Sequence, residues 1–346
     1  MEHWAHLTII LLAASLLLFG FSFHNETTSS INAPEAIYVL EKVEIGGMDQ
    51  WVLVKGRDTA NPVLLWLHGG PGASLMPASW YFDDELLNDF VVVHWDQIGS
   101  GKSNTWGFDY DQLNLERYVQ DAQEVTNYIK EKLGKEKIYI IGYSWGSRIG
   151  IRLSARHPED FYALISLGQV VSPMKDHVVT FNRVMAKAQE QDNERDITRL
   201  EMLGEPPYTE HKDYTILREM AQQYDGGTDF GYLKLAWLGL QSSEYRLRDY
   251  PLYIAGYLKG LNAMWEESIE FDAFAEVQTL KLPVYFLIGS EDLFTPVELV
   301  REYYEYLDAP MGKELIVFEH SAHAPFMSEP EKFREVLLRI KHETYK

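Results

Sequence analysis

Short, continuous hydrophobic runs recur along the chain between longer stretches that have helical periodicity. Strands covered on both faces are typically unbroken apolar runs, so this pattern predicts a mainly parallel sheet with helices on both faces. Two of the runs, Tyr38–Leu40 and Trp51–Val54, flank Gly46-Gly47 and predict an antiparallel hairpin at the start of the sheet. The fold class is therefore α/β, with eight strands. The other six runs are residues 63–67, 91–95, 138–141, 163–167, 284–288 and 315–318.

Helical patterns account for most of the remaining chain. Residues 113–133 place leucine, valine, alanine and isoleucine along one stripe, which predicts an amphipathic helix. Residues 172–280 interrupt the alternation of strand and helix with consecutive helical patterns, which predicts a helical cap inserted between the sixth and seventh strands. Such a cap would roof the carboxyl edge of the sheet. The expected units are an N-terminal segment, 1–33, the first part of the core, 34–171, the helical cap, 172–280, and the second part of the core, 281–346.

The N-terminal segment contains an almost entirely apolar run, Leu7–Phe23, followed by the polar stretch His24–Asn32. The run is intermediate in length between the hydrophobic region of a signal peptide and the shortest bilayer-spanning helix. No Lys or Arg precedes it and no small-x-small cleavage site follows it, so a cleaved signal peptide and a membrane anchor both stay open. We expect an exported protein that is extracellular or anchored in a membrane facing away from the cytoplasm.

Composition limits the function classes. The formal net charge of −21 makes nucleic acid an unsuitable partner, because no basic stripe is available to neutralise phosphates. The absence of cysteine excludes disulfides, thiol chemistry and a lipid anchor on cysteine. A chain of 346 residues is long enough for a core domain with an inserted cap.

Ser144 is the strongest candidate for chemistry. It lies in Gly142-Tyr143-Ser144-Trp145-Gly146, between the strand 138–141 and a helical pattern from 147 to 157. A strand, a sharp turn through a Gly-x-Ser-x-Gly motif and a helix form the nucleophile elbow of serine hydrolases. Only residues as small as glycine fit on either side of such a turn. We therefore predict that Ser144 is a nucleophile.

The acid and base of a catalytic triad should follow the serine in the order acid, then histidine. Asp292 and Glu291 lie just after the seventh predicted strand, and His320 and His323 lie just after the eighth. Asp292 is preferred because an apolar pair and a Thr-Pro turn follow it. His323 is preferred because the loop ends there. A metal site from the two histidines is not expected, because no third ligand has a suitable spacing.

An oxyanion hole needs two backbone N–H donors near the nucleophile. The strand 63–67 runs into the glycine-rich loop 68–72, which allows a backbone N–H to approach a substrate oxygen closely. Trp145, which follows the nucleophile, would supply the second donor.

Three motifs together resemble one known family. They are HGGPG at 68–72, DQIGSGKS at 96–103 and GYSWGS at 142–147. This combination resembles the prolyl aminopeptidase (proline iminopeptidase) family of α/β-hydrolases, whose motifs typically are HGGPG, DQRGxGxS and GGSWGS in that order. The resemblance implies an α/β-hydrolase fold, Ser144, Asp292 and His323 as the catalytic triad, and oxyanion donors at Gly70 and Trp145. It extends over residues 62–155 and, in the general manner of α/β-hydrolases, over residues 283–340.

The chain departs from this family at Ile98, where the family has arginine, and at Tyr143, where it has glycine. Family members bind the free amine of the peptide through glutamates of the cap. By resemblance, Glu266, which follows Trp265, is the nominee for that role here, and Gly69 is expected to line the substrate site. The other cap glutamates considered are Glu201, Glu205, Glu244 and Glu267.

We therefore expect a serine hydrolase, an aminopeptidase that releases N-terminal proline or small apolar residues from peptides. The alternative enzyme is a carboxylesterase or lipase-like hydrolase, because triad chemistry serves esters equally well. A non-catalytic binding protein on the same fold is the alternative from another class. The chemistry requires no cofactor. The expected partner is a small peptide or ester. Membrane attachment through the apolar N-terminal run stays open, as does the oligomeric state.

Overall fold

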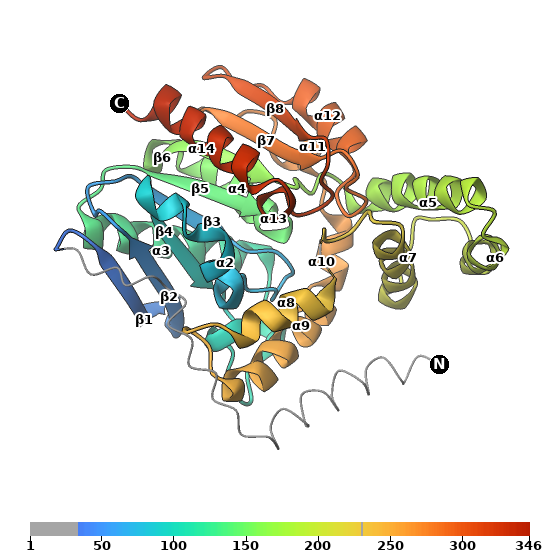
Figure 1. The fold of residues 1–346 in the computed structure, drawn as a ribbon, viewed down its shortest axis with the longest axis horizontal. Helices are drawn as coiled ribbons and strands as arrows, with labels where there is room; N and C mark the ends of the chain where they lie inside the picture. The colour runs from blue at the N-terminus through green and yellow to red at the C-terminus, as the bar shows by residue number, and fades with distance from the viewer. Residues whose placement is uncertain (1–33, 230) are drawn as a thin grey trace.

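The computed structural model describes residues 34–229 and 231–346, and they contain one eight-stranded sheet (Figure 1). Its strand order is β1-β2-β4-β3-β5-β6-β7-β8, with β1 and β2 antiparallel to their neighbours and the other strands parallel. The predicted α/β class with a hairpin followed by a parallel sheet is thus confirmed. The strands are β1 (Ile37–Ile45), β2 (Met48–Gly56), β3 (Val63–Leu67), β4 (Val91–Asp96), β5 (Ile138–Tyr143), β6 (Phe161–Leu167), β7 (Val284–Gly289) and β8 (Lys313–Phe318).

Helices cover both faces of the sheet, as the continuous apolar strands predict. In β3, Val63, Leu65 and Leu67 join the hydrophobic cluster on one face, whereas Leu64 and Trp66 join the cluster on the other. The first face is covered by α3 (Leu115–Leu133), α4 (Trp145–Arg156) and α12 (Val297–Tyr306), and the second by α2 (Ser79–Asp83), α13 (Pro325–Ser328) and α14 (Pro330–Thr344).

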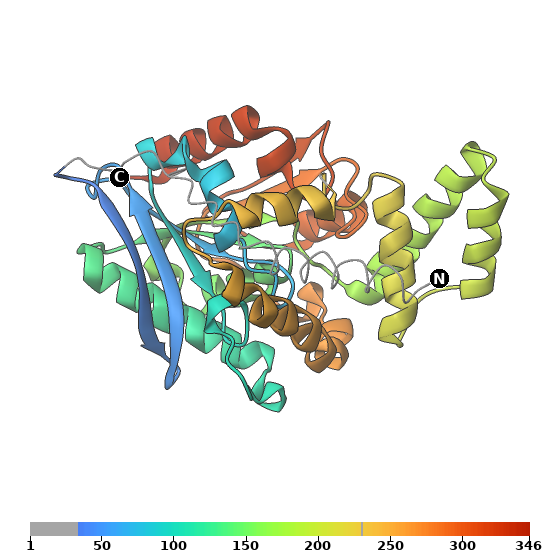
Figure 2. The ribbon, with the colours of Figure 1, turned by 60° about the horizontal axis from the view of Figure 1, so that its bottom comes forward.

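Between β6 and β7 the described chain forms helices and no strand of the sheet. Figures 1 and 2 show α5, α6 and α7 projecting away from the sheet, while α8 and α9 lie closer to the core. Consecutive helices are what the helical patterns of residues 172–280 predict. The helices are α5 (Pro173–Glu190), α6 (Glu194–Leu203), α7 (His211–Gln223), α8 (Tyr232–Leu240), α9 (Tyr250–Ala263), α10 (Trp265–Glu270) and α11 (Ala273–Glu276).

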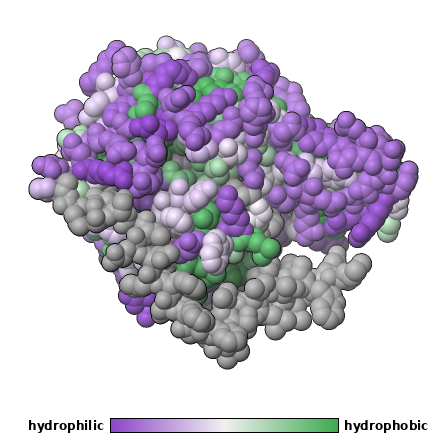
Figure 3. Space-filling model, in the orientation of Figure 1, coloured by the Kyte–Doolittle hydropathy of each residue, from purple (hydrophilic) through white to green (hydrophobic). Residues whose placement is uncertain are grey.

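The projecting part, α5–α7, is called the cap lobe below. It has a hydrophobic cluster of its own, in which Leu200, Leu217 and Met220 are fully buried. Leu293 and Phe294, which follow β7 in the core, also belong to this cluster. The face of the lobe that Figure 3 shows is mainly hydrophilic. The lobe is therefore packed onto the loop that carries Asp292.

Short 3-10 helices complete the connections. Two of them, η3 (Gly101–Ser103) and η6 (Leu247–Asp249), take part in contacts between core and cap that are described below. The others are η1 (Met76–Ala78), η2 (Leu86–Asn88), η4 (Tyr110–Gln112) and η5 (Pro158–Asp160).

The apolar run Leu7–Phe23, expected as a signal peptide or membrane anchor, lies outside the described residues. Within residues 34–229 and 231–346, none of the helices combines the length and the apolar character needed to span a bilayer.

Candidate active site

Ser144 occupies a strained turn between β5 and α4. Its backbone angles are φ 52° and ψ −118°, a positive φ that residues with a side chain rarely adopt. The Ser144 N–H donates to the carbonyl oxygen of Leu167 at the end of β6, at 2.9 Å. The half-buried serine is thus presented at the carboxyl edge of the sheet, between neighbouring parallel strands.

Gly146 explains why this turn requires a small residue two positions after Ser144. A Cβ atom on Gly146 would lie 2.0 Å from the carbonyl oxygen of Leu67 on β3, which is far inside van der Waals contact. The glycine therefore allows the first turn of α4 to pack directly against the sheet.

Asp292 has a fully buried carboxylate with four donors around it. One oxygen accepts the backbone N–H groups of Phe294 and Thr295, at 2.8 and 2.9 Å. The other accepts the Thr295 hydroxyl at 2.8 Å and His323 Nδ1 at 2.7 Å. Because every contact favours the same orientation, the carboxylate is fixed before any substrate arrives.

The imidazole of His323 is held between this carboxylate and two aromatic rings. The rings of Tyr143 and Phe294 each lie 5.2 Å from the imidazole, centroid to centroid. An Nδ1–H that donates to Asp292 fixes the tautomer and leaves Nε2 as a proton acceptor. The backbone of Gly168, next to the Leu167 carbonyl that holds Ser144, lies against this ring, since a Cβ there would be 3.1 Å from His323 Cε1.

The structure gives the alternative acid and base different surroundings. His320 is exposed, and its backbone N–H donates to Glu329 at 3.0 Å. Glu291 pairs with Lys187 at 2.9 Å and with Arg183 at 3.3 Å, both on α5, and these cations lower the pKa of Glu291. Neither residue is part of the contact between Asp292 and His323.

The glycine-rich loop 68–72 lies beside the nucleophile. A Cβ atom on Gly69 would be 3.3 Å from Ser144 Cβ, so a larger residue would crowd the serine. Gly70 has φ 118°, and a Cβ there would lie 2.5 Å from the N atom of Gly72. Only glycine accommodates this conformation, so the loop beside Ser144 carries no side chain at this position.

Trp145 is the first residue of α4 and is buried. N–H groups in the first turn of a helix have no acceptor within the helix, so they can bind an anionic oxygen. Gly70 and Trp145 therefore stay the two candidate donors of an oxyanion hole.

The second motif, residues 96–103, is hydrogen-bonded to the glycine-rich loop. His68 accepts from the Gln97 N–H at 3.2 Å through Nε2, and its Nδ1 is 2.8 Å from the carbonyl oxygen of Gly69. Burial lowers the pKa of His68 to about 4, so the ring is neutral at physiological pH and serves as a structural hydrogen-bonding group.

The buried carboxylate of Asp96, the first residue of the second motif, accepts hydrogen bonds from Lys102 N at 2.7 Å and from the Tyr245 hydroxyl of the cap.

The two departures from the family pattern are both buried. Ile98 belongs to the main hydrophobic cluster and is 1% exposed. Tyr143 packs against His323 and Phe326, and burial raises the pKa of its hydroxyl, so it stays neutral. A tyrosine beside the nucleophile thus fills space next to the imidazole that a glycine would leave open.

The cap glutamates do not provide a buried, unpartnered carboxylate. Glu266 is exposed on α10, so the structure does not place it in a closed amine-binding pocket as expected. Glu201 and Glu205 are also exposed. Glu267 accepts from the backbone N–H of Leu115 at 3.0 Å, and Glu244 accepts from the Tyr38 hydroxyl at 2.6 Å.

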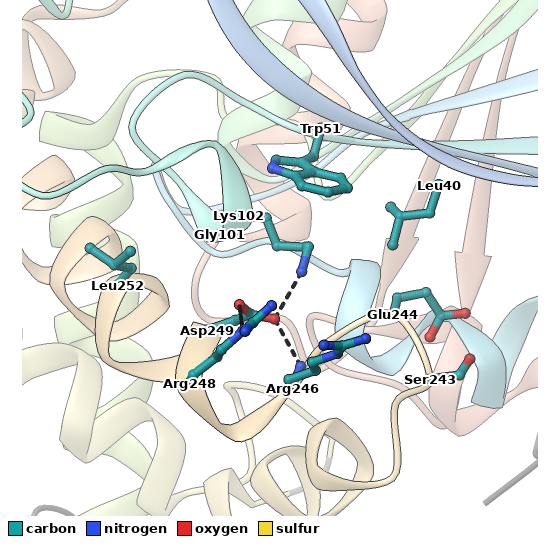
Figure 4. A pocket seen from close by; sticks show the side chains of 10 residues that line it. All are labelled: Leu40, Trp51, Gly101, Lys102, Ser243, Glu244, Arg246, Arg248, Asp249 and Leu252. Atoms are coloured by element: carbon teal, nitrogen blue, oxygen red, sulfur yellow. Dashed lines mark hydrogen bonds and ion pairs between the residues drawn. The ribbon is translucent and has the colours of Figure 1, made fainter. Parts of the chain in front are cut away.

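Glu244 faces a cavity of about 300 Å³ at the hairpin edge of the sheet (Figure 4). In this cavity Lys102 donates to Asp249 at 2.8 Å and stacks over Trp51, 4.8 Å from the ring centroid. None of Ser144, Asp292 and His323 lines it. The contact joins η3 of the core to η6 of the cap.

Two acidic residues near the triad were missed by the sequence analysis. Asp176, in the first turn of α5, is 6% exposed, and in the described part of the chain its carboxylate has no hydrogen-bond or ion-pair partner. Asp229 accepts hydrogen bonds from the backbone on both sides of His323. Both lie in helical or loop sequence where acidic residues usually face solvent, so no pattern distinguished them.

The sequence and the fold are similar to those of known proteins. Residues 62–330 match the model of the alpha/beta hydrolase fold family. A probable aminopeptidase YbaC of Bacillus subtilis is 30% identical over 310 residues, which cover 88% of this chain and 96% of that protein. A proline iminopeptidase of Heyndrickxia coagulans is 27% identical over 290 residues, covering 80% of this chain and 88% of the relative. The crystal structure of a proline iminopeptidase of Mycobacterium smegmatis superimposes with a TM-score of 0.60 at 18% identity, covering 88% of this chain and 98% of the other.

Proposed function

We propose, from the premise that this chain belongs to the α/β-hydrolase fold family, that it is a serine hydrolase in which Ser144, His323 and Asp292 form the catalytic triad. The observation that carries the proposal is the buried 2.7 Å hydrogen bond between Asp292 and His323, at the sheet edge where Ser144 is held at positive φ. In the described residues the Ser144 hydroxyl makes no hydrogen bond to the imidazole. Such contacts often form only with substrate bound.

The residues can carry out acyl transfer in two steps. His323 Nε2 takes the hydroxyl proton as Ser144 Oγ bonds to the substrate carbonyl carbon, and the N–H groups of Gly70 and Trp145 stabilise the oxyanion. The imidazolium then gives its proton to the leaving group, which departs and leaves an acyl-enzyme. A water molecule, deprotonated by His323, releases the acyl group and restores the serine. Asp292 stabilises the imidazolium in both steps.

The finer proposal is an aminopeptidase that releases N-terminal proline or a small apolar residue. Its support is the similarity to relatives named aminopeptidase and proline iminopeptidase, together with the buried carboxylate of Asp176. Burial raises the pKa of Asp176 well above its usual range, while Arg148 lowers it and Asp292 raises it. These influences indicate that Asp176 lies within electrostatic reach of the triad.

A buried carboxylate without a partner is costly, and a substrate ammonium would supply one. Because binding would favour the ionised form of Asp176, the affinity for a free amine should rise with pH until the carboxyl group is deprotonated. We propose Asp176, instead of Glu266, as the group that recognises the amine.

Substrate comparison tests this proposal. Prolyl and alanyl anilides with a free amine should be hydrolysed, whereas their N-acetylated forms should not. Asp176→Asn should raise KM for the free-amine anilides by roughly 10- to 100-fold, because a buried charge pair is lost, and leave hydrolysis of p-nitrophenyl butyrate unchanged. Glu266→Gln, a matched change at an exposed position of the same cap, should leave both activities intact.

Hydrolysis of acetylated and free substrates at equal rates would contradict the aminopeptidase assignment. A preference for butyrate esters by orders of magnitude in kcat/KM would identify an esterase with the same triad.

A further inference from the structure

A short segment of the cap, Gly226–Asp229, lies between the two loops that carry the acid and the base. The backbone N–H of His323 donates to the Gly227 carbonyl at 3.0 Å. The backbone N–H of Leu293, next to Asp292, donates to the Gly226 carbonyl at 2.7 Å. A cap segment thus takes part in the backbone hydrogen bonding of both catalytic loops.

The Asp229 carboxylate extends this contact to either side of the histidine. One oxygen accepts from Ala322 N at 2.5 Å and the other accepts from Ala324 N at 2.7 Å. Three consecutive N–H groups, at 322, 323 and 324, therefore donate to the same cap segment. The position of the imidazole depends on this backbone.

The segment Gly226–Asp229 is in turn hydrogen-bonded to the cap lobe. The Gln222 side chain on α7 accepts from Thr228 N at 2.9 Å and donates to the Thr228 carbonyl at 3.0 Å. From α5, the Thr180 hydroxyl donates to the Leu293 carbonyl at 2.8 Å. A continuous path of hydrogen bonds therefore runs from two cap helices to both catalytic loops.

We propose that Asp229 is a positioning residue that fixes the His323 loop from the cap side and places a second negative charge near the imidazole. This inference rests on the proposed role of His323 as the base. The two carboxylates act differently. Asp292 contacts the imidazole ring itself, whereas Asp229 accepts hydrogen bonds from the backbone N–H groups of the residues on both sides of His323. Loss of Asp229 should disturb catalysis without removing any group that contacts substrate.

Several charged or titratable groups surround this arrangement. Asp292 follows β7, Tyr143 ends β5, and Arg218 on α7 lies 3.5 Å over the ring of Phe294, which itself packs against His323. Burial raises the pKa of Asp229, the N–H groups of Ala322 and Ala324 lower it, and Asp292 raises it. Asp292 also raises the pKa of Asp176 on α5, after the larger effect of burial.

The test uses the full-length protein and the rate of phosphonylation by a fluorophosphonate, followed across pH. In Asp229→Asn the amide can accept only one of the two N–H groups, and the negative charge is lost. We expect the rate at the optimum to fall roughly 10- to 100-fold. The acid limb should move to lower pH by roughly half a unit or more, because imidazolium formation becomes less favourable.

Two further variants separate charge from geometry. Asp225→Asn removes the same charge at an exposed position of the adjoining turn, and it should leave both the rate and the acid limb unchanged. Asp229→Glu keeps the charge but lengthens the side chain, so it should lower the rate while the acid limb stays near the wild-type value. If Asp229→Asn does not fold, the rate of Asp229→Glu alone tests the inference: a lowered rate supports it, and an unchanged rate contradicts it.

The inference is overturned if the wild type reacts but Asp229→Asn keeps its rate within about twofold and its acid limb in place. It is also overturned if Asp225→Asn shifts the limb equally, since the effect would then be one of overall charge. A folded wild type that does not react at all contradicts the proposed function as well.

Discussion

The loops of the core and the helices of the cap differ in how their buried polar groups are satisfied. In the core, the Asp292 carboxylate accepts four hydrogen bonds and holds His323 in one orientation. In the described part of the cap, Nε2 of the buried His177 has no hydrogen-bond partner, and the carboxylate of Asp176, a residue that is 6% exposed, forms no hydrogen bond or ion pair. A site whose polar groups are all hydrogen-bonded is organised before substrate binds, whereas a buried polar group without a protein partner is free to pair with a ligand. The core therefore determines the reaction, and we expect the cap to determine the substrate.

The largest expected effect is in the core, at the base. His323→Ala should reduce kcat by roughly 10⁴- to 10⁶-fold, because triad members act as a unit. The matched change His320→Ala affects an exposed side chain three residues away and should leave kcat within about twofold. Steady-state kinetics with purified, folded variants measure both. Similar losses at the two histidines would show that the core site is not organised as described.

A smaller effect is expected at the acid, where core and cap meet. Asp292→Asn should lower kcat by roughly 10⁴-fold, since the amide favours the wrong tautomer of His323. Glu291→Gln breaks only the half-exposed pairs with Lys187 and Arg183 of the cap, so its effect on kcat should stay within about threefold. If Glu291→Gln were as damaging as Asp292→Asn, these cap ion pairs would matter as much for catalysis as the contact between Asp292 and His323.

The sequence predicts the core well for a physical reason. A strand covered on both faces has to be apolar throughout, so a run such as residues 284–288 is visible without any other information. The turn at Ser144 is equally restrictive, because Gly146 lies directly against the Leu67 carbonyl. Where the surrounding atoms permit only one type of residue, the sequence contains a recognisable motif.

The cap carries no comparable constraint. Its lobe needs apolar side chains at helical spacing, as at Leu217 and Met220, but many sequences meet that need. The proposed role of Asp229 depends on tertiary contacts with residues more than 90 positions away, such as the hydrogen bond between Asp229 and Ala322. Trp265 was taken as a pointer to Glu266, yet it packs against His177 and Tyr214, and Glu266 faces solvent. Sequence spacing cannot show which carboxylate folds inward.

The most direct test of the account is to identify the residue that a fluorophosphonate modifies. Mass spectrometry of the trypsin digest should find the adduct on the peptide 138–148, at Ser144, and Ser144→Ala should acquire no adduct under the same conditions. Circular dichroism of both proteins controls for folding. An adduct on another residue, equal labelling of Ser144→Ala, or no labelling of the folded wild type would contradict the central claim that Ser144 is an activated nucleophile.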